Sequence, residues 1–160
     1  RLGDSWAVYQ HERDEIFDFI RDNHIEGVFG ISGDSHMGEL NCVPRSEQGG
    51  YDFYDLCSSP PANLPDPDFV DQMPEVRIRS PWTRSCNVGL VDFSFEDGPR
   101  LTYTLHNIYG APAWAPLVLT PADLRNGASS WRQKIDEREL VRLERYRAGG
   151  AYYDPDARVD

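Results

Sequence analysis

A carboxylate and an imidazole stand two residues apart in the segment Gly33-Asp34-Ser35-His36, a tight loop that begins with glycine. An oxygen donor and a nitrogen donor together suit a metal ion such as iron, manganese or zinc. The same spacing also fits a structural role, in which Asp34 caps the residues around Met37 and His36 binds a backbone carbonyl. On spacing alone, both interpretations stay open.

The elements before this pair must position it. The segment Gly27 to Ser32 is short and apolar on both faces, which predicts a buried central strand that ends in the loop. Residues Glu12 to Asn23 carry acids in the first turn and Arg21 in the last, which predicts a helix. A helix followed by a buried strand indicates an α/β fold, and open α/β sheets bind ligands beyond the carboxyl ends of their strands.

The segments that follow predict more strands and one long loop. Glu39 to Val43 and Tyr51 to Ser58 are expected to be strands. The stretch from Ser59 to Arg84 is rich in proline, which favours an irregular loop long enough to carry function.

The second half of the chain contains the clearest local pattern. Two β-rich segments, Val88 to Phe95 and Leu101 to Ile108, flank the turn sequence at 96–99, which predicts an antiparallel hairpin at about 88–108. Leu117 to Leu119 is expected to add a strand, and Trp131 to Arg147 to form a charged helix. The apolar face of that helix is thin and consists of Trp131, Ile135 and Val141.

Composition excludes several classes of function. The 160 residues carry a formal charge of −11, whereas binding to a nucleic-acid backbone draws on clustered Lys and Arg, so we do not expect double-stranded nucleic acid as a partner. No apolar segment reaches the roughly 18 residues of a membrane span. The three cysteines show no Cys-x-x-Cys spacing, which argues against a structural zinc site.

The order of motifs resembles a known family. Asp4-Ser5-Trp6, then Glu12-Arg13, a helix, and a strand leading into the Asp34 and His36 motif are similar to the C-terminal half of the PhoD-like alkaline phosphatases. The likeness continues through 87–91 and the hairpin and covers about residues 3–124. Those enzymes are calcineurin-like metallophosphoesterases, so the resemblance implies the C-terminal part of a two-sheet β-sandwich flanked by helices. Residues 1–124 would form that segment, and residues 125–160 a charged, partly helical tail.

The resemblance also implies roles for two residues. His36 falls on the metal-binding histidine of the family's late Gly-Asp-x-His motif, and Asp34 on its acidic position, so both are implied as catalytic residues and metal ligands. Two metal ions, iron with calcium or else manganese or zinc, would activate a water that hydrolyses a phosphomonoester or phosphodiester. The superfamily's first motif, Asp-x-His, also fits this segment, but the motifs that must follow it are absent after residue 36.

Two ligands do not complete a two-metal site, and no second loop with this pair of residue types follows a predicted strand. We therefore expect the remaining ligands on a missing N-terminal half of the same enzyme or on another polypeptide, and no activity from this chain alone. The lack of an initiator Met at Arg1 agrees with a start inside a longer protein. The alternative is a non-catalytic interaction or structural subunit that retains the fold. A secreted or periplasmic location would follow from the family resemblance alone.

Three residues are weaker candidates for binding the substrate. Arg84 belongs to the long loop, and a guanidinium matches phosphate bidentately, although loop arginines are more often solvated. Arg13 lies among acidic residues, which favours pairing with Asp14, Asp18 or Asp4. Trp6 would either shape the mouth of a pocket or staple the first helix to the core. The other loop arginines considered for an anion pocket are Arg77 and Arg79.

Overall fold

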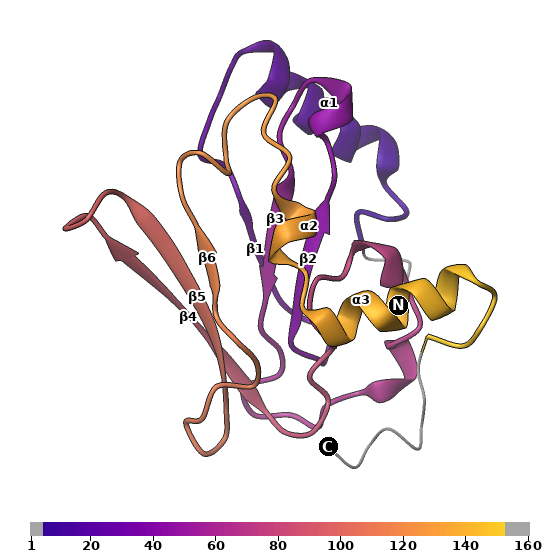
Figure 1. Cartoon of the computed structure of the whole chain (residues 1–160). Helices are drawn as coiled ribbons and strands as arrows, with labels where there is room; N and C mark the ends of the chain where they lie inside the picture. The colour runs from indigo at the N-terminus through magenta and orange to yellow at the C-terminus, as the bar shows by residue number, and fades with distance from the viewer. Residues whose placement is uncertain (1–4, 153–160) are drawn as a thin grey trace.

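The computed structural model describes residues 5–152, which form a mixed α/β fold with two three-stranded sheets and a few helices (Figure 1). The α/β prediction is confirmed at this level. Asp4 of the first motif and residues 153–160 of the predicted tail lie outside the described residues.

The first sheet has the strand order β1-β3-β2. Strand β3 (Phe53–Cys57) is central and pairs parallel with β1 (Gly30–Ser32) and antiparallel with β2 (Glu39–Val43). The bounds predicted for β2 are confirmed, and β3 is shorter than the segment predicted for it. The parallel pairing aligns Ser32 with Cys57, so that β1 and β3 end at the same edge of the sheet.

The prediction of a buried central strand before Asp34 is wrong. Strand β1 lies at the edge of the sheet, and the side chain of Ile31 is 69% exposed. The apolar residues Val28 and Phe29, which suggested a strand buried on both faces, precede β1 and pack against the core from outside the sheet. Val28 and Phe29 therefore hold the segment that leads into β1 against the core, while β1 itself lies at the edge of the sheet.

The second sheet contains the predicted hairpin, which is confirmed. Strands β4 (Asn87–Ser94) and β5 (Arg100–Asn107) pair antiparallel, with Val91 opposite Tyr103. Gly98 in the connecting turn has φ +97°, a conformation that glycine adopts without strain. Strand β6 (Leu117–Leu119) continues the sheet antiparallel to β5, as expected.

The two sheets share one hydrophobic core. Strands β2 and β3 contribute Leu40, Tyr54 and Leu56, and the facing strand β5 contributes Tyr103 and Leu105, all at most 1% exposed. A side chain at Gly38 would overlap that of Leu105, because the segment entering β2 lies directly against the second sheet. Since successive residues of a strand point to opposite faces, the other side chains of β2 and β3 face away from this core.

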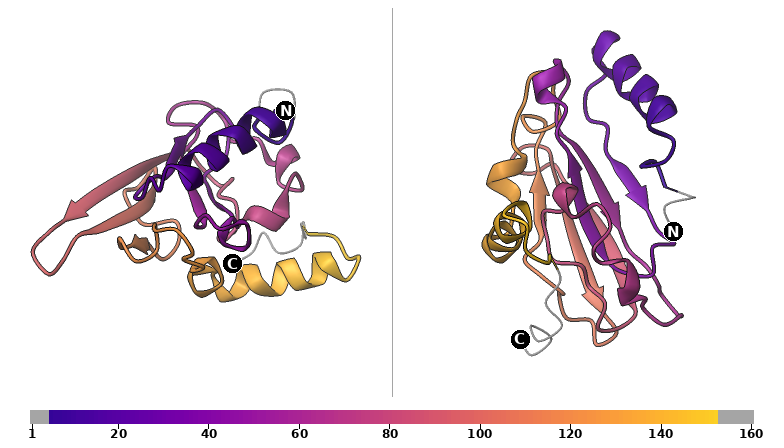
Figure 2. Two further views of the ribbon diagram at one scale, coloured as in Figure 1. Left: turned by 90° about the horizontal axis from the view of Figure 1, so that it is seen from above. Right: turned by 90° about the vertical axis from the view of Figure 1, so that its right-hand side faces the viewer.

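Helix α1 (Gln10–Asp22) covers part of the opposite face of the first sheet. The predicted helix is confirmed, with the Phe17 ring centroid 5.0 Å from that of Phe53 on β3. Figure 2 shows α1 and the C-terminal helices on opposite sides of the sheets. The first sheet is therefore flanked by the core on one side and by α1 on the other.

The single C-terminal helix predicted from Trp131 is interrupted. Helix α2 (Trp131–Lys134) ends before Asp136, whose side chain caps α3 (Glu137–Arg147) by accepting a hydrogen bond of 3.0 Å from the Arg138 amide. This break changes the buried face: Leu143 is fully buried, whereas Val141, predicted to face the core, is 62% exposed.

The described part of the predicted tail, residues 125–152, packs onto the shared core. The backbone amides of Ser130 and Trp131 donate to the buried carboxylate of Asp52, at 2.8 and 3.0 Å. The side chains of Trp131 and Ile135 pack against the core cluster.

The predicted long loop at 59–84 is irregular apart from two single-turn 3-10 helices, η3 (Pro67–Phe69) and η4 (Pro74–Val76). A third such turn, η2 (Ser46–Gln48), connects β2 to β3. Within residues 5–152, no helix has the length and apolar character that crossing a membrane requires.

Candidate functional site

The face of the first sheet that points away from the core borders a groove of about 560 Å³. The groove floor is formed by side chains of the three strands, and its walls are the segment before α1 and the loop around η4. The polar side chains of the floor come from Ser32, Glu39, Asn41 and Asp55.

Asp34 and His36 both line this groove, in the loop that follows the carboxyl end of β1. Both have left-handed backbone conformations, with φ +63° and +58°. For a residue other than glycine such a conformation costs about 1–2 kcal/mol and is concentrated at functional sites. The loop is held by hydrogen bonds from the Ser35 hydroxyl to the Met37 carbonyl (2.9 Å) and from the Asp66 amide to the His36 carbonyl (2.8 Å).

The donor set at this loop fits a metal ion in type but not in number. A carboxylate and an imidazole suit iron, manganese or zinc, and within residues 5–152 no hydrogen bond to the His36 ring is found. Nevertheless, no group of three or more His, Cys, Asp or Glu side chains that could hold a metal occurs among the described residues. Asp34 and His36 are therefore at most part of a metal site, because a tetrahedral site needs at least three protein donors.

A buried arginine ties the loop wall of the groove to the sheet. Arg77 is only 1% exposed, and its Nε and Nη2 contact Oε1 of Glu39 at 3.1 and 3.0 Å. Its Nη1 donates to the Val70 carbonyl, and the guanidinium carbon lies 5.3 Å from the centroid of the Tyr152 ring. Through these contacts Arg77 stabilises the wall of the groove, so we assign it a structural role.

Asp55 lies on the groove floor in an environment that disfavours its charge. Burial raises the pKa of the Asp55 carboxyl, and the nearby Glu39 raises it further, while hydrogen bonds from Ser32 and Asn41 act in the opposite direction. The Ser32 hydroxyl donates to Oδ2 of Asp55 at 2.9 Å. Oδ1 of Asn41 is buried, and among the described residues it has no hydrogen-bond partner.

The three weaker candidates for substrate binding occupy different places. Trp6 lines the groove, and its ring centroid lies 5.9 Å from that of Phe17 on α1 and 6.1 Å from that of Phe53, whereas its role in binding a substrate stays a prediction. Arg13 also lines the groove, but its guanidinium is bound to Asp14 at 2.9 Å, as the acidic helix suggested. Arg84 is exposed over the ring of Trp82 and does not belong to the groove lining.

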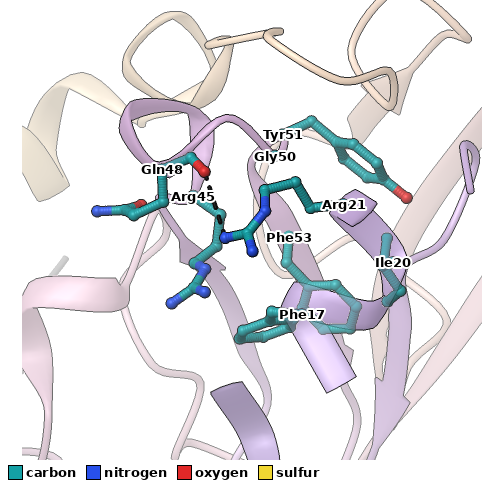
Figure 3. A pocket seen from close by; sticks show the side chains of 8 residues that line it. All are labelled: Phe17, Ile20, Arg21, Arg45, Gln48, Gly50, Tyr51 and Phe53. Atoms are coloured by element: carbon teal, nitrogen blue, oxygen red, sulfur yellow. Dashed lines mark hydrogen bonds between the residues drawn. The ribbon is translucent and has the colours of Figure 1, made fainter. Parts of the chain in front are cut away.

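A second, much smaller cavity lies between α1 and the turn before β3 (Figure 3). Its volume is about 20 Å³, which is room for one water molecule. Figure 3 shows Arg21 beside it, reaching the backbone carbonyl of Gln48 at 3.4 Å. Arg45 on its rim is paired with Asp18 at 3.1 Å and lies over the Phe17 ring. The cavity is therefore a packing feature of α1.

Sequence reasoning missed Glu39 and Asp55 as parts of the site, whereas Arg77, which was considered for an anion pocket, does line the groove. A weak signal was present, because Glu39 and Asn41 alternate with apolar residues along β2 and therefore share one face. Nothing local indicated that Asp55 joins them, since that depends on how β2 and β3 are aligned.

Comparison with protein-family models, with curated proteins and with solved structures finds no match for this chain. The likeness to PhoD-like phosphatases thus rests on the sequence motifs alone.

Proposed function

We propose that this chain supplies one part of a metal-dependent phosphoester hydrolase, with Asp34 and His36 as metal ligands and the remaining ligands on a polypeptide outside it. The observation that carries the proposal is the loop after β1, where two donor residues of different types hold left-handed conformations beside a groove. Two sheets that share one core also agree with the C-terminal part of a calcineurin-like sandwich.

The groove and the metal would have separate tasks. Bound metal ions, iron with calcium or else manganese or zinc, supply an activated water and neutralise the charge of the phosphoryl group. The residues of this chain hold the ester, and a groove of about 560 Å³ falls within the usual range of small-molecule sites. Arg13 and Arg77 are both paired with carboxylates, so phosphate should bind here only when metal is present.

Metal binding by the chain itself is the first test. Titration calorimetry with Mn²⁺ should show binding that His36→Ala weakens about tenfold or more, because a ligand is lost. His11→Ala is the matched control, since His11 is exposed on α1 and pairs with Glu15. Inorganic phosphate should then bind to the manganese-loaded chain and not to the metal-free chain. Equal Mn²⁺ affinity of the wild type and His36→Ala would contradict the proposal.

Hydrolysis of p-nitrophenyl phosphate with added iron, calcium or manganese is the second test. The 160-residue chain alone should be inactive, and a longer polypeptide or complex that carries the remaining ligands should be active and should lose activity with His36→Ala. Robust turnover by the chain alone, abolished by His36→Ala, would show that the site is complete without further ligands.

A non-catalytic subunit is the second candidate function, and the exposed apolar side chains of the edge strands favour it. Ile31 on β1 is 69% exposed, and Leu90 and Phe93 on β4 are 56% and 57% exposed. Both strands are at the ends of their sheets within the described residues, and such edges pair readily with another chain. Hydrogen exchange that becomes slower at Ile31 in a complex that binds no metal would favour this role over catalysis.

A further inference from the structure

The first residue of β4 is bound to the segment that follows β3. The side-chain amide of Asn87 donates a hydrogen bond to the Ser59 carbonyl at 2.6 Å, and Oδ1 of Asn87 accepts one from the Ser59 amide at 2.9 Å. The backbone amide of Asn87 donates to the Pro60 carbonyl at 3.0 Å. These hydrogen bonds fix the chain after β3 to the start of the second sheet.

Ser59 connects Asn87 to the loop that carries His36. The Ser59 hydroxyl accepts a hydrogen bond from the His36 backbone amide at 3.3 Å. The His36 carbonyl accepts a hydrogen bond from the Asp66 amide at 2.8 Å. Asn87 also lies against the loop directly, because a β-carbon built on Gly38 would be 3.3 Å from its Oδ1. Both backbone groups of His36 are therefore engaged, and one of the two contacts leads back to the second sheet.

The contact between Asn87 and Ser59 is shielded from water. Asn87 is 2% exposed and Ser59 is 4% exposed. Buried amide and carbonyl groups need protein partners, because water does not reach them to replace a lost hydrogen bond. Without the Asn87 side chain, the amide and the carbonyl of Ser59 would lose these partners, and the segment would move to find others. Since the His36 amide is bonded to the Ser59 hydroxyl, this movement would extend to His36.

The loop needs such support because its backbone is strained. Asp34 and His36 have left-handed φ values, which persist in residues other than glycine only where the surrounding structure holds them. We propose that Asn87 is a positioning residue that acts through Ser59 and keeps His36 in the conformation in which it lines the groove. That this conformation serves metal binding rests on the proposed function, whereas the support of the loop does not depend on metal.

NMR spectra of the metal-free chain test the support of the loop. The ¹³Cα and ¹³Cβ chemical shifts of Asp34 and His36 report the φ angles of these residues. Asn87→Ala should move these chemical shifts toward the values of extended residues. The same substitution should speed hydrogen exchange of the His36 amide about tenfold, because one hydrogen-bonded support is lost. Ser59→Ala, which removes only the hydroxyl acceptor, should move the same signals in the same direction.

Asn107→Ala is the matched control. Asn107 is paired with Asn87 across β4 and β5, and its Oδ1 accepts hydrogen bonds from the amides of Tyr109 and Ala111. The control therefore removes an asparagine that supports a different loop at the same level of the sheet. It should leave the signals of His36 unchanged, so a general loss of stability does not imitate the expected result.

Mn²⁺ titration calorimetry then tests whether the position of His36 matters for metal binding. Asn87→Ala should weaken Mn²⁺ binding about tenfold, the lower end of the effects of residues that orient a metal ligand. The double variant with Asn87→Ala and Ser59→Ala should bind no more weakly than Asn87→Ala alone, because both substitutions act through the same contact. Asn107→Ala should bind Mn²⁺ like the wild type.

Chemical shifts of His36 that stay at their wild-type values in either Asn87→Ala or Ser59→Ala overturn the proposal. If Asn87→Ala does not fold, the milder Ser59→Ala decides. Mn²⁺ binding that depends on His36 but is unchanged in Asn87→Ala overturns the positioning role and leaves the proposed function intact. Shifted His36 signals in a chain whose wild type binds no Mn²⁺ support the role of Asn87 and contradict only the proposed function.

Discussion

Replacing Asp55 by asparagine should stabilise the protein at neutral pH. The substitution keeps the shape of the side chain and its ability to accept the hydrogen bond from Ser32, and it removes a negative charge from a buried place near Glu39. Functional groups are commonly held at a cost to stability, and this cost would be measurable.

The magnitude follows from the linkage between proton binding and folding. The pKa of Asp55 is raised in the folded chain, chiefly by burial. A raised carboxyl pKa favours folding at pH below the unfolded pKa, and this contribution is lost as pH rises through the folded pKa. Each pKa unit of difference then removes about 1.4 kcal/mol from the free energy of unfolding at neutral pH. For a chain of this size, each kcal/mol corresponds to about 2–4 °C in Tm.

Urea denaturation of the wild type and Asp55→Asn from pH 4 to pH 8 measures this effect. The two proteins should be nearly equal in stability at the acid end, and the variant should become the more stable one as pH rises. Asp92→Asn, whose side chain is exposed on β4, should track the wild type throughout. A variant less stable than the wild type at pH 8, with a deficit that grows with pH, would show that a cation compensates the Asp55 charge and would refute the reasoning.

Two further substitutions test the packing that supports the groove. Leu143→Ala should lower the free energy of unfolding by about 2–5 kcal/mol, because Leu143 is fully buried, whereas Val141→Ala, at a residue 62% exposed, should change it by less than about 0.5 kcal/mol. A loss below about 1 kcal/mol for Leu143→Ala would mean that α3 is not part of the cooperative fold. Gly38→Ala should cost about 1–3 kcal/mol, since its new side chain would overlap Leu105 between the sheets. An unchanged urea midpoint would show that the sheets separate easily there.

The hairpin was predictable because its information is local. The turn at Asp97 and Gly98 and the alternation of buried and less buried residues along β5 both depend on residues that are neighbours in the sequence. The break before α3 also had a local signal, since Asp136 followed by Glu137 is a typical helix start. The many charged residues around Asp136 made this N-cap hard to recognise in the sequence.

The position of β1 was not predictable in the same way. An apolar segment shows that residues become buried, but it does not show which element buries them. Val28 and Phe29 pack against the core before the strand begins, while Ile31 within the strand is exposed. The place of a strand in its sheet is decided by pairing with distant segments, and that pairing has no signature in the strand itself.

The candidate site also has a part that was predictable from neighbouring residues and a part that was not. The location of Asp34 and His36 after a strand followed from contiguous residues, and the structure places both beside the groove. The groove floor required the alignment of β2 with β3, which sets Asn41 opposite Asp55. The link from Glu39 to Arg77 joins residues far apart in the chain, so only the folded structure reveals it.

The contact between Arg77 and Tyr152 makes the end of the chain relevant to anyone who shortens the protein for crystallisation. A version ending at Gly149 would keep every residue that lines the groove, yet it would lose the ring beneath the guanidinium of Arg77. It would also leave the buried carboxylate of Glu139 without the phenol that hydrogen-bonds to it. Ending the chain at Gly149 would therefore alter the groove wall, and a purification tag is better attached where it leaves Tyr152 in place.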